Sequence, residues 1–287
     1  MTPPAAQLRC GGRTLALDAA VVMGVLNVTP DSFSDGGHHA ALDAALARAE
    51  RIAEEGAAIL DIGGESTRPG AQGVDSEEEL RRVLPVVECV AARLPLLISI
   101  DTSNPSVMRR ATDAGAHLIN DVRALRVPGA LEAVTASRLG VCLMHMQGEP
   151  ATMQRDPRYG DVVAEVRTQL EVSLQACERA GVEPDRICLD PGFGFGKTTA
   201  HNLTLLRDLP QVRVGGRPLC VGLSRKSLVA ALTGRPLAER LAGSVALATV
   251  AVLKGASIVR AHDVAATVDA VRVANALRDA APVAADS

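Results

Sequence analysis

Residues 190–202, DPGFGFGKTTAHN, contain the residue types of a phosphate-binding loop. A nucleotide-binding P-loop reads G-x-x-x-x-G-K-[ST], and here Pro191 stands in place of the first glycine. The dinucleotide pattern G-x-G-x-x-G fails as well, because Gly192, Gly194 and Gly196 are evenly spaced. The stretch is therefore not predicted to bind ATP, and its role depends on the aspartate at its start.

That aspartate belongs to a series of polar residues that each follow a short aliphatic run. The series is Asn27, Asp61, Asp101, Asn120 with Asp121, His145, Asp190, Ser224 to Lys226, and Arg260 with His262 and Asp263. A single residue of this kind commonly caps the next helix. A polar group after every run is better explained by a ligand site, because burying it without a partner costs free energy.

The chemistry of the series indicates what the ligand is. Asp101, Asn120 and Asp190 offer acceptors and one amide, which suit a flat heterocycle that presents adjacent N–H groups to a carboxylate. Arg260 offers donors for phosphate, and Lys226 precedes a predicted helix whose first N–H groups attract anions. We expect a flat, amide-edged ring at the bottom of the site and anionic groups above it.

The aliphatic runs that position these residues alternate with helical segments. The runs begin near residues 21, 57, 96, 117, 140, 186, 218 and 257. Near-continuous apolar runs of this length are typical of parallel strands buried on both faces. Eight strand–helix units predict a (β/α)8 barrel, whose strands would bring the polar series to one face; an open doubly wound sheet fits the same periodicity.

The ends of the chain complete this prediction. The segment QLRCGGRTLAL predicts a β-hairpin that turns at Gly11 and Gly12 and closes the bottom of the barrel. No linker interrupts the pattern, so we expect a single domain over residues 1–287, with a core at about 14–280 and a disordered tail at 281–287.

Composition excludes several classes of protein. A net charge of −3 without a Lys/Arg stripe argues against nucleic acid as a partner. No apolar run reaches the ~20 residues of a membrane span, and the start has no apolar signal segment, which indicates a soluble, cytoplasmic protein. The six cysteines lack C-x-x-C spacing. Cys142, Cys188 and Cys220 lie in strand-like runs, so we expect buried thiols.

Rare residues and unusual loops give further hints. Phe33, Phe193 and Phe195 are the three phenylalanines, and all lie in loops, where they contact a ligand or fold onto the core. Two loops, NVTPDSFSDGGHHA and GGESTRPGAQGVDS, have the glycines and prolines of mobile lids, with ordinary surface loops as the alternative.

Eight motifs together closely resemble the bacterial dihydropteroate synthases. They are MGVLNVTPDSFSDGG, DIGGESTRPGA, SIDTS, INDV, LMHMQG, LDPGFGFGK, GLSRKS and RAHDV, and the resemblance extends from about residue 14 to residue 275. It implies that a dihydropterin carrying a CH2-diphosphate is joined to the amine of 4-aminobenzoate, for folate synthesis. It also implies an SN1-like, Mg2+-assisted loss of pyrophosphate.

The resemblance also implies roles for particular residues. The pterin would contact Asp101, Asn120, Asp190, Lys226, Met144 and Gly222. The diphosphate would contact Asn27, Thr67, Arg260 and His262, with Asn27 also a Mg2+ ligand. The 4-aminobenzoate site, which sulfonamides occupy in this family, would contain Phe33, Ser66, Thr67, Arg68, Pro69, Phe195 and Ser227. Asp101, Asp190, Lys226 and Asp35 would be catalytic; His38 and His39 have no implied role.

Alternatives remain at this point. A pterin-dependent methyltransferase would use similar residues but should lack NVTPDSFSDGG and SRKS, and a non-catalytic pterin-binding homologue would retain only the pocket. The segment GSVALATVAVLKGA is apolar nearly all round. A helix of that kind is buried more fully than a barrel's outer helix, so we expect a homodimer interface, in line with the family.

Overall fold

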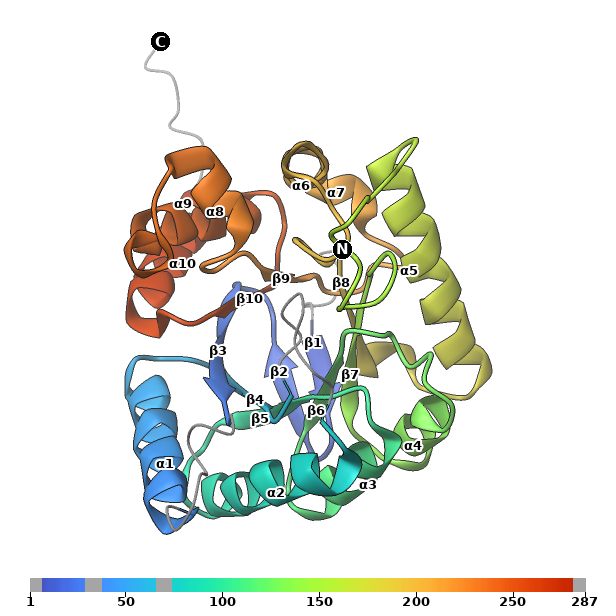
Figure 1. Ribbon diagram of the computed structural model, residues 1–287, viewed down its shortest axis with the longest axis vertical. Coiled ribbons are helices and arrows are strands. Elements are labelled where there is room, and N and C mark those ends of the chain that lie inside the picture. Colours follow the sequence, from blue (N-terminus) through green and yellow to red (C-terminus); the bar gives the residue numbers. More distant parts are fainter. Residues whose placement is uncertain (1–6, 29–37, 66–73, 281–287) are drawn as a thin grey trace.

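The computed structural model describes residues 7–28, 38–65 and 74–280, without the side chains of His38 and His39 (Figure 1). Six predicted site residues lie outside these ranges, as does the tail from residue 281. They are Phe33, Asp35, Ser66, Thr67, Arg68 and Pro69. The central parts of both predicted lid loops fall in the same gaps.

Eight parallel strands form the centre of the molecule. They are β3 (Val21–Asn27), β4 (Ile59–Gly63), β5 (Leu97–Asp101), β6 (Leu118–Asp121), β7 (Gly140–Met144), β8 (Ile187–Asp190), β9 (Cys220–Gly222) and β10 (Ile258–Ala261). Their order is β8-β7-β6-β5-β4-β3-β10-β9. A parallel bridge between Leu189 and Leu219 joins the two outer strands of this order. The sheet is therefore a closed barrel, and the open doubly wound sheet is excluded.

Helices surround the barrel, as Figure 1 shows. They are α1 (His38–Glu54), α2 (Ser76–Arg93), α3 (Pro105–Asp113), α4 (Ala130–Ala136), α5 (Val162–Arg179), α6 (Thr199–Arg207), α7 (Leu209–Val212), α8 (Ser227–Thr233), α9 (Leu241–Leu253) and α10 (Val264–Asp279). Short polar residues cap two of the long helices, α2 and α5. Asp75 accepts the N–H of Glu78 at 2.9 Å in α2, and Asp161 accepts the N–H of Val163 at 3.0 Å in α5.

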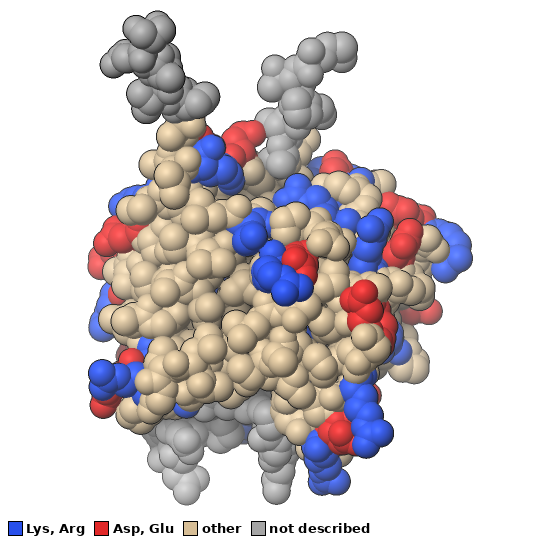
Figure 2. Space-filling view, turned by 90° about the horizontal axis from the view of Figure 1, so that it is seen from above, with Lys and Arg blue, Asp and Glu red and all other residues tan. Residues whose placement is uncertain are grey.

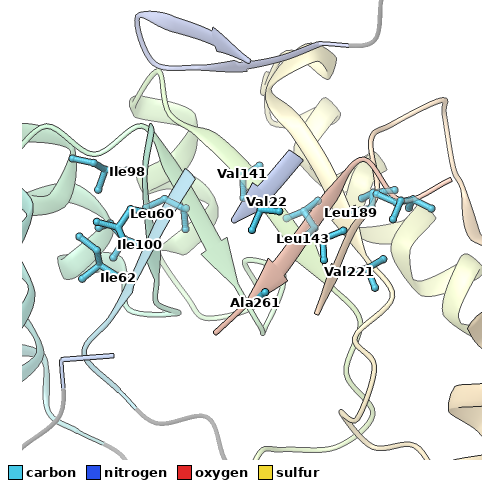
Figure 3. Packing of buried hydrophobic residues seen from close by; sticks show 14 of the residues in the cluster. Val22, Leu60, Ile62, Ile98, Ile100, Val141, Leu143, Leu189, Val221 and Ala261 are labelled. Carbon is cyan, nitrogen blue, oxygen red and sulfur yellow. The ribbon is translucent and has the colours of Figure 1, made fainter. Parts of the chain in front are cut away.

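Side chains alternate between the two faces of each strand. Leu60 and Ile62 of β4 and Ile98 and Ile100 of β5 belong to the main core, between the strands and the helices (Figure 3). The intervening positions face the barrel interior. Its lower layer is apolar: Met23, Ile59, Leu97, Leu118, Cys142, Cys188, Cys220 and Ile258. The layer two residues further along is largely polar: Val25, Asp61, Ser99, Asn120, Met144, Asp190, Gly222 and Arg260.

The predicted hairpin closes the lower end. Strands β1 (Gln7–Cys10) and β2 (Arg13–Ala16) turn at Gly11 and Gly12. Leu8 and Leu15 pack onto the apolar layer of the interior. Arg9 holds the hairpin in place by two bonds of 3.0 and 3.1 Å to Asp185.

Buried residues confirm one prediction and resolve another. The thiols of Cys142, Cys188 and Cys220 are fully buried. Phe193 is buried in the main core rather than facing the barrel mouth, so it folds onto the core. Phe193 is buried because the chain turns inward after β8. The amino-acid composition of the loop does not predict the direction of that turn.

One outer face of the barrel exposes large apolar side chains. We call it the apolar outer patch: Leu232, Leu237, Leu241, Val250, Leu253, Val273 and Leu277, on α8, α9, α10 and the turn Leu237–Glu239. Figure 2 shows few charged side chains over α8 and α9 at the left of the view. In the single chain α9 is thus only partly covered. No helix among the described residues is long and apolar enough to cross a membrane.

Candidate active site

The carboxyl ends of the strands bring Asp101, Asn120, Asp190 and Arg260 to one end of the barrel interior. All four are buried or half-buried. Neighbouring strands in register explain the convergence, since Asp101 on β5 pairs directly with Asn120 on β6. The sequence prediction of a polar ring at this end is confirmed for these residues.

Arg260 links two carboxylates across the ring. Its Nε donates to Asp61 Oδ2 at 2.6 Å, and its Nη2 donates to Asp101 Oδ2 at 2.7 Å. Burial alone would lower the pKa of Arg260, but the charges of Asp61 and Asp101 hold it above its ordinary value. Burial raises the pKa of Asp101 to about 7, with Arg260 opposing the rise. The guanidinium is a permanent cation, so the site is built to hold negative charge beside it.

Asp190 and Lys226 form the opposite side of the ring. Asp190 Oδ1 accepts the N–H of Gly192 at 2.7 Å, which leaves Oδ2 for another donor. Burial raises the pKa of Asp190, and the Lys226 charge acts against that rise. Lys226 Nζ donates to the carbonyl of Phe193 and lies 4.7 Å from the centre of the Phe195 ring. Burial lowers the pKa of Lys226 to about 8.

Small and apolar residues leave room between these polar groups. Gly222 has no side chain, and a Cβ there would lie 3.7 Å from Arg260 Cβ and 3.8 Å from Lys226 Nζ. Met144 is buried with Val122 and Met146, and Phe195 packs against that small cluster. These residues can contact the faces of a flat ring while the polar groups contact its edge.

The glycine-rich stretch after Asp190 is a tight turn held from inside by Lys197. Its Nζ contacts the carbonyls of Gly192 at 2.9 Å and Phe195 at 3.1 Å, and His145 Nδ1 at 2.8 Å. Burial lowers the pKa of Lys197 to about 7 and that of His145 to about 3. The lysine of this motif therefore shapes the turn, and the sequence reasoning missed this role.

Other members of the polar series have structural roles. Asp121 accepts the N–H groups of Arg123 at 2.8 Å and Leu125 at 2.7 Å, and so caps the turn after β6. Arg225 forms an ion pair with Asp263. A single sequence position cannot distinguish such capping from ligand binding, because both place an acceptor directly after a strand.

The mouth of the barrel holds the residues expected to meet anions. His262 contacts Ser224 Oγ through its N–H and its Nδ1, both at 3.2 Å. Ser227 is exposed at the first position of α8. Asn27 ends β3, and a side chain at Gly63 would lie 3.8 Å from both Asn27 Oδ1 and Asp101 Oδ2. Gly63 therefore keeps space open between these two oxygens.

No group of three or more His, Cys, Asp or Glu residues in the described chain could hold a metal ion by itself. An amide oxygen such as Asn27 Oδ1 is a ligand type that Mg2+ accepts. This ion usually keeps few protein ligands and takes the rest from substrate phosphates and water. The described residues thus offer Asn27 Oδ1 as one ligand of the kind that such a Mg2+ ion accepts.

Comparison with known proteins agrees with this geometry. The family model described as pterin binding enzyme matches residues 23–262. The dihydropteroate synthase of Escherichia coli K12 is 52% identical over 265 residues, covering 92% of this chain and 94% of that protein. A Yersinia pestis dihydropteroate synthase solved with a sulfonamide drug complex has a TM-score of 0.91 at 50% identity, covering 96% of this chain and all of the other.

A third relative was solved with a reaction product. The Burkholderia cenocepacia dihydropteroate synthase complexed with 7,8-dihydropteroate is 52% identical, with a TM-score of 0.87 over 96% of this chain and 97% of the other. Fold and site thus define an enzyme of the pterin-binding barrel class. Within that class the chain belongs to the dihydropteroate synthase family, and its activity is that of a dihydropteroate synthase, a transferase.

Proposed function

We propose that the protein joins (7,8-dihydropterin-6-yl)methyl diphosphate to 4-aminobenzoate, with release of pyrophosphate, by the residues that line this end of the barrel. The observation that carries the proposal is the ring of Asp101, Asn120 and Asp190, three acceptor groups buried beside the cations Arg260 and Lys226. A pterin edge supplies N–H groups to such acceptors, and its diphosphate supplies the negative charge that the cations attract.

The pterin lies with its amide edge on Asp190. One carboxylate oxygen accepts the N–H of Gly192, and the other would accept from the ring. Asp101 and Asn120 accept or donate along the rest of the edge, and Lys226 contributes a positive charge near Asp190. Met144 and Gly222 bound the faces of the ring.

Departure of pyrophosphate is the demanding step. Arg260 and His262 bind the diphosphate, and Thr67, outside the described residues, is expected to assist them. Asn27 would hold a Mg2+ ion, which when bound would neutralise charge on the leaving group. The C–O bond breaks with its electron pair leaving on pyrophosphate, and the cation left on the pterin methylene is stabilised by the carboxylates of Asp101 and Asp190, with Asp35 as a further candidate.

The aniline nitrogen of 4-aminobenzoate then attacks the methylene and releases a proton. The expected second-substrate site combines Phe195 and Ser227 with Phe33, Ser66, Arg68 and Pro69 from the two predicted lids. In support, Phe195 packs beside Lys226 and Ser227 is exposed at the same end of the barrel. Sulfonamides, as analogues of 4-aminobenzoate, would compete there.

The assembly is a homodimer in this proposal. The apolar outer patch supports it, because contiguous exposed apolar surfaces commonly mark protein interfaces. We further propose that residues 1–287 form one domain with its core at about 14–280, and that the protein works in the cytoplasm. Support for that location comes from its cysteines, all of which are free thiols.

The decisive test is pyrophosphate release from the dihydropterin diphosphate, with Mg2+, with and without 4-aminobenzoate. We expect release that increases with 4-aminobenzoate and forms dihydropteroate. In Lys226→Ala, kcat/KM should fall at least about 100-fold, because the buried charge beside Asp190 is lost. Tight pterin binding without turnover in the wild type would instead identify a binding protein.

A further inference from the structure

Asp61 is a fully buried carboxylate on β4 that the proposed function leaves without a role. It lies in the polar layer of the barrel interior, directly above Ile59 of the apolar layer. Its Oδ2 accepts from Arg260 Nε at 2.6 Å and from Asn120 Nδ2 at 3.2 Å. Those two donors belong to the side chains assigned above to the diphosphate and to the pterin.

The bond to Arg260 fixes one end of the guanidinium. Arg260 also donates to Asp101 through Nη2, at 2.7 Å. Asp101 is itself assigned to the pterin, so this second bond competes with the substrate. Asp61 is fully buried in the layer below Asp101, and its Oδ1 has no hydrogen-bond partner among the described residues. It can hold the Nε side of Arg260 while the Nη groups turn to a diphosphate.

The bond to Asn120 fixes the direction of an amide. An ionised carboxylate only accepts hydrogen bonds, so it selects the NH2 side of Asn120 and not its carbonyl side. The carbonyl oxygen and the second N–H of Asn120 then have fixed positions, from which they can bind the edge of a ring. Without Asp61, both orientations of the amide would be possible, and only one would match a given heterocycle.

We propose that Asp61 is a positioning residue that orients Arg260 for the diphosphate and Asn120 for the pterin. The proposal rests on the roles of Arg260 and Asn120 in the proposed function. It predicts a selective effect of Asp61 on the pterin substrate, whereas a purely structural carboxylate would affect stability and both substrates alike.

Asp61→Asn is the main variant, because it keeps the shape of the side chain and removes its charge. We expect the Kd of the dihydropterin diphosphate, measured by calorimetry, to rise at least about tenfold, as the loss of a charged hydrogen bond predicts. The KM for 4-aminobenzoate should change less than about twofold. Equal changes for both substrates would overturn the proposal.

Ser99→Ala is the matched control. Ser99 is the register partner of Asp61 on β5 and is equally buried, but its Oγ has no hydrogen-bond partner within the described part of the chain. Ser99→Ala should change the Kd of the dihydropterin diphosphate and the KM for 4-aminobenzoate by less than about twofold each, since it removes no hydrogen bond. Asp61→Ser should show the same selective rise in the Kd of the dihydropterin diphosphate as Asp61→Asn. With two variants, a folding defect in one of them does not decide whether Asp61 is a positioning residue.

A double-mutant cycle tests whether Asp61 acts through Arg260. If it does, Asp61→Asn introduced into Arg260→Ala should weaken pterin diphosphate binding by less than about threefold further, because only the contact of Asp61 with Asn120 then remains to be lost. Independent, multiplicative effects would overturn the proposal. If Arg260→Ala and Asn120→Ala leave binding of the dihydropterin diphosphate unchanged, the proposed site itself is wrong, and the Asp61 inference falls with it.

Discussion

At the scale of single residues, the site is shaped by buried charges whose partners are few. Lys197 is 3% exposed, and among the described residues its Nζ is held by two carbonyl oxygens and one imidazole nitrogen. Such a lysine costs free energy to ionise, because water has been replaced by neutral dipoles. Its ionisation is therefore coupled to folding, and this coupling can be measured.

Replacement of Lys197 by methionine should change how stability depends on pH. The pKa of Lys197 is lowered to about 7 in the folded protein from an ordinary 10.5, so between these values the unfolded chain binds more protons. Stability due to this residue is then fully present above the unfolded pKa and is lost as pH falls through about 7. Relative to Lys197→Met, the wild type should gain up to about 1.4 kcal/mol per pH unit between pH 7 and 9.

Urea unfolding of both proteins at pH 7, 8 and 9 measures this difference directly. Other titrating groups are common to the two proteins and largely cancel in the comparison. Parallel stability curves would show that Lys197 keeps its ordinary ionisation in the folded state, contrary to the prediction.

At the scale of elements, the turn after β8 is the segment that most constrains the site. Gly192 has φ of +68°, and a Cβ there would lie 1.9 Å from the carbonyl oxygen of His145. A Cβ at Gly196 would likewise lie 2.4 Å from the carbonyl oxygen of Gln147. The turn therefore packs directly onto the backbone after β7, and its glycines are required by contact as well as by conformation.

Gly192→Ala and Gly216→Ala form a matched pair for this element. Gly216 has φ of +69° but nothing within 4 Å of its Cβ position. Gly216→Ala should lower the free energy of unfolding by about 1 kcal/mol, the cost of a left-handed non-glycine residue. Gly192→Ala should lower it by about 2 kcal/mol more, since the turn must also shift.

The same shift of the turn should also affect catalysis, because the N–H of Gly192 donates to the carboxylate of Asp190. Gly192→Ala should lower kcat/KM for the pterin diphosphate, while Gly216→Ala should leave it near the wild-type value. Denaturant unfolding and steady-state kinetics of both variants measure the two effects. Equal stability losses would mean that the turn tolerates the added methyl group.

At the scale of the whole molecule, the barrel has different surfaces on different sides. The helices α8, α9 and α10 carry the apolar outer patch, whereas α5 lies on the other side of the barrel (Figure 1). A single exposed apolar residue needs no explanation, but a group of them on adjacent helices indicates a contact surface. The proposed homodimer would bury this patch.

Val273→Asp with Leu277→Asp should convert the proposed dimer to a monomer. Both residues lie on α10 and are more than 60% exposed, at 65% and 62%, so charges there should not disturb the single chain. Light scattering at micromolar concentration should report half the wild-type mass. The control is Val172→Asp on α5, at a residue that is 57% exposed but lies outside the patch. A monomeric wild type would contradict the proposal.

The sequence by itself predicted eight strand–helix units and most of the polar ring, and the structure then showed that the sheet closes into a barrel. Buried parallel strands require continuous aliphatic runs that end near a polar residue, so the succession of strands along the chain and the positions of Asp101, Asn120, Asp190 and Arg260 could be predicted. Motif resemblance added the family. Only the tertiary structure separated Asp121, which caps a turn, from Asp190, since both follow a strand. It also decided the partners of Lys197 and Asp61, because these contacts join residues distant in the chain, and side-chain direction at a strand end depends on how neighbouring strands are staggered.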